Sequence, residues 1–405
     1  ATQNACNLCA PLGAALVFKG IANAVPLLHG SQGCSTYIRR YMISHFKEPL
    51  DIACSNFAED TAIFGGGANL KLAIDNIRRQ YSPDLIGVAT TCLSETIGDD
   101  VPMFIKAYQN GCRDKALPAL VHVSTPSYQG THMQGFHGAV RALVATLAQS
   151  TTPDERPSVN LFPGMVSPSD LRQLKEIVAA FGLEAILVPD YSDTLNGPLW
   201  TEYQPIPKGG TPVEALRHTG SAVASIECGG VLSGEKETAG TWLEERCGVP
   251  LHRLGLPIGI DATDRFFGSL ASISDRPIPD KYTAQRGRLL DALVDGHKHF
   301  NGIRAALFGE EDLVAGLADA ASAVFTDLEA ASFGRPFDKR RAGLRGPMRG
   351  ALKRMGCRKV MFLPPLPGES TGHADMFMQI VGPRLAVAAE FPGHGSGRQR
   401  RAMER

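Results

Sequence analysis

Three cysteines and one serine combine a reactive side chain with a turn beside an apolar segment. Cys34 follows the apolar run 24–28 through a turn flanked by glycines, and the helix-like segment 38–46 comes after it. Cys9, Cys92 and Ser127 lie in comparable turns. Because α/β proteins place their chemistry where strands end, the thiols and the hydroxyl are candidates for a common metal-binding or catalytic site.

The other cysteines give weaker signals. Cys6 forms a Cys-x-x-Cys pair with Cys9, which on its own suits a redox pair, zinc or a cluster. Zinc would need a second such pair, and the sequence has none. Cys6 is therefore a less favoured ligand than Cys9. Five cysteines without an informative partner are predicted to be small buried hydrophobes or incidental thiols: Cys54, Cys112, Cys228, Cys247 and Cys357.

The sequence around these residues predicts an α/β fold with parallel sheets. Residues 1–150 alternate short apolar runs with segments of helical periodicity, which is typical of βαβ units with right-handed crossovers. The expected strands are 25–28, 85–90 and 117–123, and the expected helices include 70–81 and 101–110. The strand ends then gather at one edge of a sheet, where Cys34, Cys92 and Ser127 are expected to meet.

A second α/β domain is predicted at 151–300, after a linker at 151–153. It should contain strands at 158–162 and 185–188 around a helix at 170–181 that begins with Ser167 as its cap and Pro168 in its first position. A long amphipathic helix is predicted at 285–300. The third unit, 301–405, begins with a strand and a helix, and its part from 331 onward has 15 Lys and Arg against 5 Asp and Glu, with many prolines.

Three further groups of residues are predicted to have structural roles rather than functional ones. The three glycines at 65–67 precede a helix and could cradle a phosphate, but they match no nucleotide fingerprint, so a tight turn is the favoured interpretation. Asp261 and Asp264 are expected to cap the helix that follows them rather than to bind a metal. His297 and His299 are expected on a helix surface or in packing contacts rather than as ligands.

The composition excludes several classes of protein. The 41 basic and 41 acidic residues cancel, so the total charge predicts neither a nucleic acid partner nor an anionic membrane partner. No apolar run approaches the roughly 20 residues that a membrane helix needs, and residues 1–7 are too polar for a signal peptide. A cytoplasmic protein is expected. Thiols in such a protein are more often buried, metal-binding or catalytic than paired in disulfides.

The spacing of the four residues resembles that of a known family, the larger component of nitrogenase. Cys9, Cys34, Cys92 and Ser127 are 25, 58 and 35 residues apart, which is similar to the β-type subunit, where three cysteines and a serine hold half of an iron–sulfur P-cluster. The resemblance runs from about Cys6 to about Leu317. It includes FKEP at 46–49, FGG at 64–66, ETIGDD at 95–100 and DATD at 261–264.

The resemblance implies repeated Rossmann-like domains and an iron–sulfur cluster at a subunit interface. The cluster would be of the P-cluster type, [8Fe-7S] or a [4Fe-4S] variant. Three cysteines and Ser127 are too few to hold a complete cluster, so the remaining ligands must come from another chain. The implied partners are a homologous α-like subunit, in an α2β2 heterotetramer, and an ATP-dependent iron protein homodimer. The α-like partner would carry the cofactor at which substrate is reduced. Tyr37 is a candidate neighbour of the electron path.

In the family that the chain resembles, the FKEP motif lies near a subunit interface, and its glutamate can help to bind a cation. The matching residue here is Glu48. A solvated or salt-bridged carboxylate is the simpler interpretation.

Three functions are compatible with the resemblance. The first is a catalytic reductase, either nitrogenase itself or a nitrogenase-like enzyme such as methylthio-alkane reductase, which cleaves carbon–sulfur bonds. The second is the β-like half of the scaffold on which nitrogenase cofactor matures, the NifN type. The third is a structural paralogue with metal-free cysteines. The full set of three cysteines and Ser127 disfavours the third, and it also disfavours the scaffold, whose subunits often keep only the equivalent of Cys34.

Within the first class, three features separate the chain from a standard molybdenum nitrogenase β-subunit. We expect no counterpart of that subunit's N-terminal extension and a shorter chain, and the sequence differs at 6–9 and at 37–41. A nitrogenase-like reductase is therefore the favoured interpretation. Its substrate would be set by the partner and the partner's cofactor.

Overall fold

The computed structural model describes residues 8–112, 117–150, 157–199, 201–229 and 237–296, together with five short segments after residue 300. Residues Cys9–Arg288 form one compact unit and the residues from Leu289 onward belong to another. Each unit is described by itself. The first unit contains two four-stranded sheets, and all of their strand pairs are parallel, so the predicted α/β class is confirmed. The predicted domain limits at 150 and 300 stay predictions.

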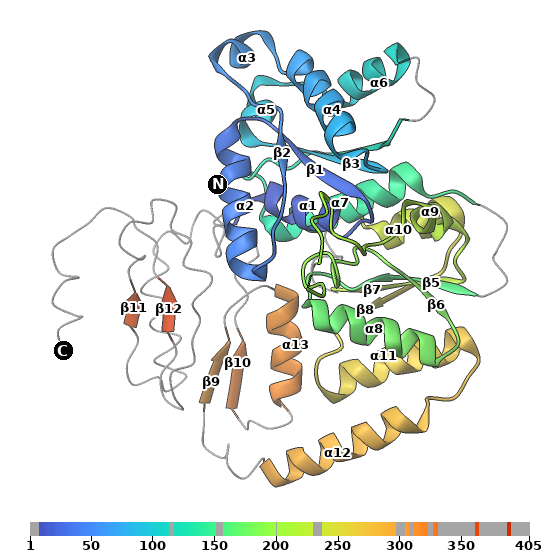
Figure 1. The fold of residues 1–405 in the computed structure, drawn as a ribbon. Helices are drawn as coiled ribbons and strands as arrows, with labels where there is room; N and C mark the ends of the chain where they lie inside the picture. Colours follow the sequence, from blue (N-terminus) through green and yellow to red (C-terminus); the bar gives the residue numbers. More distant parts are fainter. Residues whose placement is uncertain are drawn as a thin grey trace. The chain divides into compact units, whose positions relative to one another are not determined.

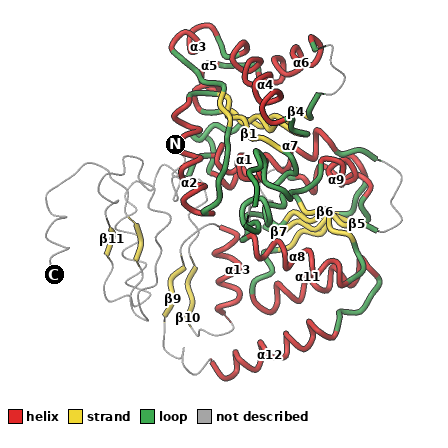
Figure 2. Tube along the Cα trace, in the orientation of Figure 1, coloured by secondary structure: helices red, strands yellow, loops and turns green. Residues whose placement is uncertain are grey.

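The first sheet has the strand order β2-β1-β3-β4. Its strands are β1 (Ala24–His29), β2 (Ala53–Cys54), β3 (Leu85–Thr90) and β4 (Ala119–Val123). The helices of this half are α1 (Ala10–Lys19), α2 (Gln32–Phe46), α3 (Glu59–Phe64), α4 (Gly67–Tyr81), α5 (Cys92–Ile97), α6 (Val101–Gly111) and α7 (His132–Leu147). Helices α4 and α6 pack on one face of the sheet, and α1 and α7 pack on the other (Figures 1 and 2).

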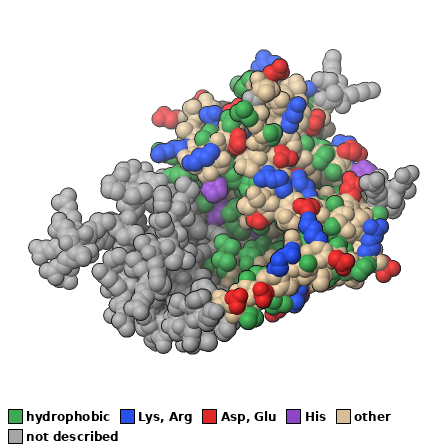
Figure 3. Space-filling model, turned by 60° about the horizontal axis from the view of Figure 1, so that its bottom comes forward, with side chains coloured by type: hydrophobic (Ala, Val, Ile, Leu, Met, Phe, Trp, Pro, Cys, Tyr) green, Lys and Arg blue, Asp and Glu red, His purple; other side chains and the backbone are tan. Residues whose placement is uncertain are grey.

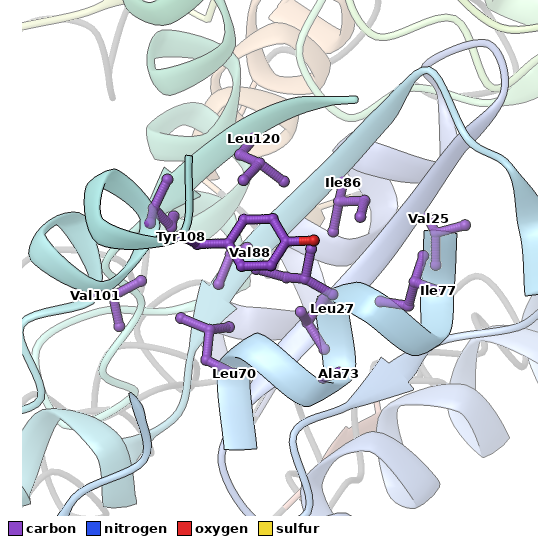
Figure 4. Packing of buried hydrophobic residues seen from close by; sticks show 12 residues of the cluster. Val25, Leu27, Leu70, Ala73, Ile77, Ile86, Val88, Val101, Tyr108 and Leu120 are labelled. Atoms are coloured by element: carbon purple, nitrogen blue, oxygen red, sulfur yellow. The ribbon is translucent and has the colours of Figure 1, made fainter. Parts of the chain in front are cut away.

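Every residue of β1 and β3 is buried, because helices cover both faces of these central strands. Side chains that are register partners share a face. Val25 pairs with Ile86, and Ile86 pairs with Leu120, and all three point toward α4 and α6 (Figure 4). Leu70 of α4 completes this layer and is almost fully buried. The rigid core places the carboxyl ends of β1, β3 and β4 beside one another.

The second sheet has the order β6-β5-β7-β8. Its strands are β5 (Ser158–Phe162), β6 (Glu184–Leu187), β7 (Ala224–Cys228) and β8 (Leu251–Leu254). The helices are α8 (Pro168–Ala180), α9 (Val213–His218), α10 (Ala239–Cys247), α11 (Gly259–Ser274) and α12 (Asp280–Gly296), with a 3-10 turn at Thr219–Ser221. Helix α7 packs against α9 and α10, so the two halves share an apolar contact. The predicted linker at 151–153 lies outside the described residues.

The described segments of the second unit are short. They are β9 (Arg304–Leu307), α13 (Glu311–Ser322), β10 (Asp327–Ala330), β11 (Met361–Leu363) and β12 (Val387–Ala389). Strands β9 and β10 pair in parallel, and so do β11 and β12. The predicted strand and helix after residue 303 agree with β9 and α13. The rest of the basic tail lies outside the described residues.

Several local predictions are confirmed. Ser167 is the N-cap of α8, where its hydroxyl accepts a hydrogen bond from the backbone N–H of Asp170 at 3.2 Å, and Pro168 opens the helix. The glycines at 65–67 form a tight turn between α3 and α4. The N–H of Gly66 donates to both carboxylate oxygens of Asp99, at 3.0 and 3.1 Å. This carboxylate occupies the anion-favouring start of α4 that a phosphate could have used.

The predicted capping by Asp261 and Asp264 is wrong. The N-cap of α11 is Ile258, and Asp261 lies inside the first turn, where its charge still favours the helix dipole. Asp264 instead forms a two-pronged ion pair with Arg286 of α12, with oxygen–nitrogen distances of 2.8 to 3.0 Å. The Arg286 hydrogen bonds lower the pKa of Asp264. Helix α12 also begins earlier than predicted, at Asp280, and His297 and His299 lie outside the described residues.

No helix in the part of the chain that the structure describes has the length and apolar character needed to cross a membrane. On the face shown in Figure 3, Lys and Arg side chains alternate with Asp and Glu side chains over the described surface. This face therefore carries no extended region of one charge.

Lys19, at the end of α1, is only 4% exposed, and burial lowers its pKa from 10.5 to about 8, although Asp51 opposes the shift. Below pH 8 Lys19 is charged in the folded protein, and the burial of this charge lowers the free energy of unfolding. Between pH 8 and 10.5 the unfolded chain binds the proton more tightly, so the contribution of Lys19 to stability improves as pH rises. We expect Lys19→Met to stabilise the protein at pH 7 by up to about 3 kcal/mol, and the gain to vanish near pH 10.5. Denaturant melts at both pH values measure it, and a gain equal at both would contradict the assignment.

Candidate metal centre

The four candidate ligands lie at the carboxyl edge of the first sheet or beside it. Cys34 is in the first turn of α2, which follows β1, and Cys92 is the first residue of α5, which follows β3. Ser127 lies in the loop after β4. Because β1, β3 and β4 are neighbours in the sheet, their carboxyl ends present these three residues in sequence along one edge.

Hydrogen bonds connect three of the four residues. The backbone N–H of Ser127 donates to the Cys92 sulfur at 3.4 Å, and the Ser127 hydroxyl accepts from the N–H of Ala10 at 3.3 Å. Cys9 is the N-cap of α1 and forms an isolated antiparallel bridge with Thr131, the N-cap of α7. These contacts agree with the expectation that strand ends gather at one edge of the sheet, and the role of the residues as ligands stays a prediction.

Close packing of α1 on α7 carries Cys9 to the edge. Gly13 of α1 and Gly135 of α7 let the two backbones touch. A Cβ added at Gly13 would lie 1.8 Å from the His132 carbonyl oxygen, and one added at Gly135 would lie 1.9 Å from that of Ala10. Only hydrogen fits at these positions. The contact fixes the first residue of α1, and therefore Cys9, against the loop that holds Ser127.

The pKa of Cys9 reflects its burial and the nearby thiols. Burial raises the pKa of the Cys9 thiol, a hydrogen bond with Ser127 lowers it, and the nearby Cys34 and Cys92 raise it further. Cys9 and Cys92 are nevertheless exposed residues, and Cys34 is half-buried. Several thiolates near one another repel, and bound iron would replace this repulsion by attraction.

The donor types of the four residues are those of an iron–sulfur cluster. Among the described residues, no three His, Cys, Asp or Glu side chains are close enough to bind one metal ion. Single-ion sites bring all ligands within about 2.3 Å of one centre, whereas each thiolate of an iron–sulfur cluster holds its own iron. Three sulfur donors and a hydroxyl beside one sheet edge are donors of the type that such a cluster takes. We keep the assignment of Cys9, Cys34, Cys92 and Ser127 as ligands as a prediction.

Tyr37 lies three residues after Cys34 on α2, so the two side chains share one face of the helix, and Tyr37 is 47% exposed. Its place on an electron path stays a prediction. Glu48 is half-buried after α2, and its cation role also stays a prediction. Cys6 lies outside the described residues.

Cys54 has surroundings that its spacing did not reveal. It ends β2, its thiol donates to the Gly30 carbonyl at 3.4 Å, and burial raises its pKa, with Cys34 near enough to add to the shift. The sequence carries no signal for this proximity, because β2 is only two residues long and pairs with β1 through tertiary structure. Its hydrogen-bonded, protonated thiol is a structural neighbour of Cys34.

The family described as nitrogenase component 1 type oxidoreductase matches residues 9–359. The match extends past Leu317, where the sequence motifs had ended, so that limit was too short. The chain is 38% identical over 314 residues to the nitrogenase molybdenum-iron protein β chain of Clostridium pasteurianum, covering 78% of this chain and 68% of the relative.

Another relative is the nitrogenase iron-molybdenum cofactor biosynthesis protein NifN of a Nostoc species, 34% identical over 320 residues, covering 79% of this chain and 71% of the relative. Among solved structures, nitrogenase Cp1 at pH 6.5 superposes with a TM-score of 0.78 at 34% identity, covering 88% of this chain and 76% of that chain. By its sequence match and its fold, this chain is a β-like member of the nitrogenase component 1 type oxidoreductase family.

Proposed function

We propose that this chain is the electron-relaying, β-like subunit of a nitrogenase-like reductase. Membership in the family implies iron–sulfur clusters, and nitrogenase β subunits work with an α partner and an iron protein. The observation that carries the proposal is the meeting of Cys9, Cys34, Cys92 and Ser127 at one sheet edge. Together they would hold half of a P-cluster-type cluster, and the α-like partner would supply the other half.

The chain's own residues define what this half contributes. Soft sulfur donors from Cys9, Cys34 and Cys92 suit iron, and the Ser127 hydroxyl adds a harder oxygen donor that a more oxidised iron favours. The N–H of Ser127 already donates to Cys92, so backbone groups can stabilise charge on that sulfur. The bound cluster would accept and release single electrons. The complex would pass them from an ATP-dependent iron protein to a cofactor on the partner.

The exposure of the site supports a shared interface. Cys9 and Cys92 are exposed, and two large aromatic residues near them, Tyr37 and Tyr128, are 47% and 50% exposed. A cluster in open water would be vulnerable to oxidation, so another chain must cover it. A homologous subunit in an α2β2 heterotetramer would do so and would bring its own thiolates.

For the substrate, we propose small thioethers, whose carbon–sulfur bond is cleaved with two electrons and two protons to give a hydrocarbon and a thiol. In favour of a substrate other than dinitrogen is the sequence at 37–41, which differs from that expected for a molybdenum nitrogenase β-subunit. The 33–38% identity to the nitrogenase β chains of Azotobacter vinelandii and Clostridium pasteurianum does not distinguish the two substrates. Nitrogenase proper remains compatible with the same identities. A NifN-type scaffold role is the second candidate, favoured by the 34% identity to the Nostoc protein.

The decisive experiment supplies the purified complex, the iron protein and ATP with dimethyl sulfide, dinitrogen or acetylene in parallel. Methane and methanethiol from dimethyl sulfide are expected, only when ATP is present. Ammonia as the main product would identify nitrogenase instead. If no substrate were reduced while the complex activated a cofactor-free nitrogenase, the reductase proposal would be replaced by the scaffold role.

We also expect this chain, when produced without its partner, to contain no cluster and to associate or precipitate. Half of the ligands would be missing, and the exposed thiols and tyrosines would face water. Co-expression with the α-like subunit should restore iron and a defined heterotetramer by light scattering. A stable, iron-containing monomer with full activity would refute the shared site.

A further inference from the structure

A buried chain of hydrogen bonds lies behind the metal centre. His29, the last residue of β1, has no exposed surface, and its Nδ1 lies 3.0 Å from the Ser55 hydroxyl. Its Nε2 lies 3.1 Å from Oδ2 of Asp99, whose side chain is 4% exposed. The edge of the His29 ring also packs against Phe57, with ring centroids 4.8 Å apart at 89°.

One tautomer of His29 satisfies every group in the chain. The Gly30 N–H donates to the Ser55 oxygen at 2.9 Å, and the Ser55 hydroxyl then donates to Nδ1. Nε2–H donates to Asp99, which also accepts from the Gly66 N–H. All donors point toward the carboxylate, which sits at the favourable start of α4. Burial lowers the pKa of His29, and Asp99 opposes the shift, which agrees with a neutral ring.

The arrangement has the residue types of a serine hydrolase triad but cannot work as one. Ser55 is 4% exposed, and its oxygen already serves the Gly30 N–H and His29. A nucleophile needs an open position for a reacting carbonyl, and a buried, saturated hydroxyl has none. The role of the three side chains must therefore lie in what they hold in place.

What they hold is the junction between two ligand-bearing elements. The His29 carbonyl accepts three hydrogen bonds from the start of α5: from the Thr91 N–H at 3.1 Å, the Thr91 hydroxyl at 3.2 Å and the Ser94 hydroxyl at 2.8 Å. Cys92 lies between these two residues. On the other side, Ser55 holds the Gly30 N–H at the start of the turn that leads to Cys34. The contact is close, since a Cβ at Gly30 would lie 1.9 Å from the Thr91 hydroxyl oxygen.

We propose that Ser55, His29 and Asp99 form a positioning device that fixes the turn carrying Cys34 against the helix start carrying Cys92, and thereby tunes the cluster that these cysteines hold. The inference rests on the proposed function. Groups that orient metal ligands typically change metal affinity or activity roughly 10- to 100-fold when they are removed. The three residues touch neither substrate nor the reacting atoms, so they act through the cysteines.

The test uses the complex with its partner and compares Asp99→Asn, which keeps the shape of the side chain but removes its charge, with Ser55→Ala. The matched control is Asp100→Asn. Asp100 is the next residue, and it caps α6 by accepting from the Met103 N–H at 3.0 Å, a role that asparagine also fills. Iron content, thermal unfolding, the EPR spectrum and the midpoint potential of the cluster are measured for all. Ser55→Thr, which restores the hydroxyl, serves as the rescue variant.

Asp99→Asn and Ser55→Ala are expected to retain iron and a cooperative unfolding transition while the EPR spectrum and midpoint potential shift. Asp100→Asn should match the wild type, and Ser55→Thr should lie closer to it than Ser55→Ala does. Unchanged EPR and potential in both test variants would overturn the inference. So would a loss of iron that only follows loss of the folded domain, since the network would then be structural alone. A wild-type complex without iron would instead remove the proposed function.

Discussion

Replacing Cys34 with alanine in the assembled complex is expected to abolish the interface cluster. Cys34 lies in the first turn of α2 at the end of a fully buried strand, so its position is fixed by the core of the sheet. Alanine offers no donor atom, so the iron that Cys34 would hold loses a ligand. Iron analysis and low-temperature EPR of the purified variant measure the loss.

The control for this variant is Cys247→Ala. Cys247 is a half-buried thiol at the end of α10, on the second sheet's side of the unit, and its loss should leave iron content unchanged. Cys6→Ala should have a smaller effect than Cys34→Ala. Equal loss of the cluster in the Cys6 and Cys34 variants would mean that Cys6 is a true ligand. Full iron content in Cys34→Ala would disprove the proposed ligand set.

Gly135→Ala is expected to destabilise the first unit and to displace Cys9. The added Cβ would lie 1.9 Å from the carbonyl oxygen of Ala10 and 2.6 Å from its carbonyl carbon, and both are backbone atoms that cannot rotate away. Helix α1 must therefore move from α7. Overpacking of this kind costs roughly 1–3 kcal/mol. The helix preference of alanine offsets about 1 kcal/mol of this cost. At about 2–4 °C per kcal/mol for a unit of this size, the melting temperature should fall by up to roughly 8 °C.

Gly138→Ala on the same helix is the control that separates the clash with α1 from the effect of alanine on the helix itself. Its Cβ would meet only the Val123 side chain at 3.5 Å, an ordinary contact. Alanine is favoured over glycine inside a helix by about 1 kcal/mol at both positions, so Gly138→Ala should be neutral or stabilising. Calorimetry gives the melting temperatures of both variants, and the iron content of their complexes reports whether Cys9 is displaced. Equal melting temperatures for the two variants would show that the α1–α7 contact is not what holds Cys9.

The sequence by itself determined the features that local pattern encodes. Short apolar runs alternating with helical periodicity predict buried parallel strands, and β1, β3 and β5 lie where they were expected. Ser167 and Pro168 start α8 because capping depends on residues a few positions apart. The positions of Cys34, Cys92 and Ser127 after apolar runs also suffice to place the three residues at one sheet edge, since parallel strands end at a common edge.

Only the tertiary structure decided the features that depend on contacts between distant residues. Asp264 was expected to cap its own helix, but a bidentate arginine 22 residues away is a stronger partner than a helix end. The proximity of Cys54 to Cys34 follows from the pairing of β2 with β1. His29 and Asp99, 70 residues apart, meet because a buried imidazole and a buried carboxylate each need a hydrogen-bond partner, and folding alone brings them within reach.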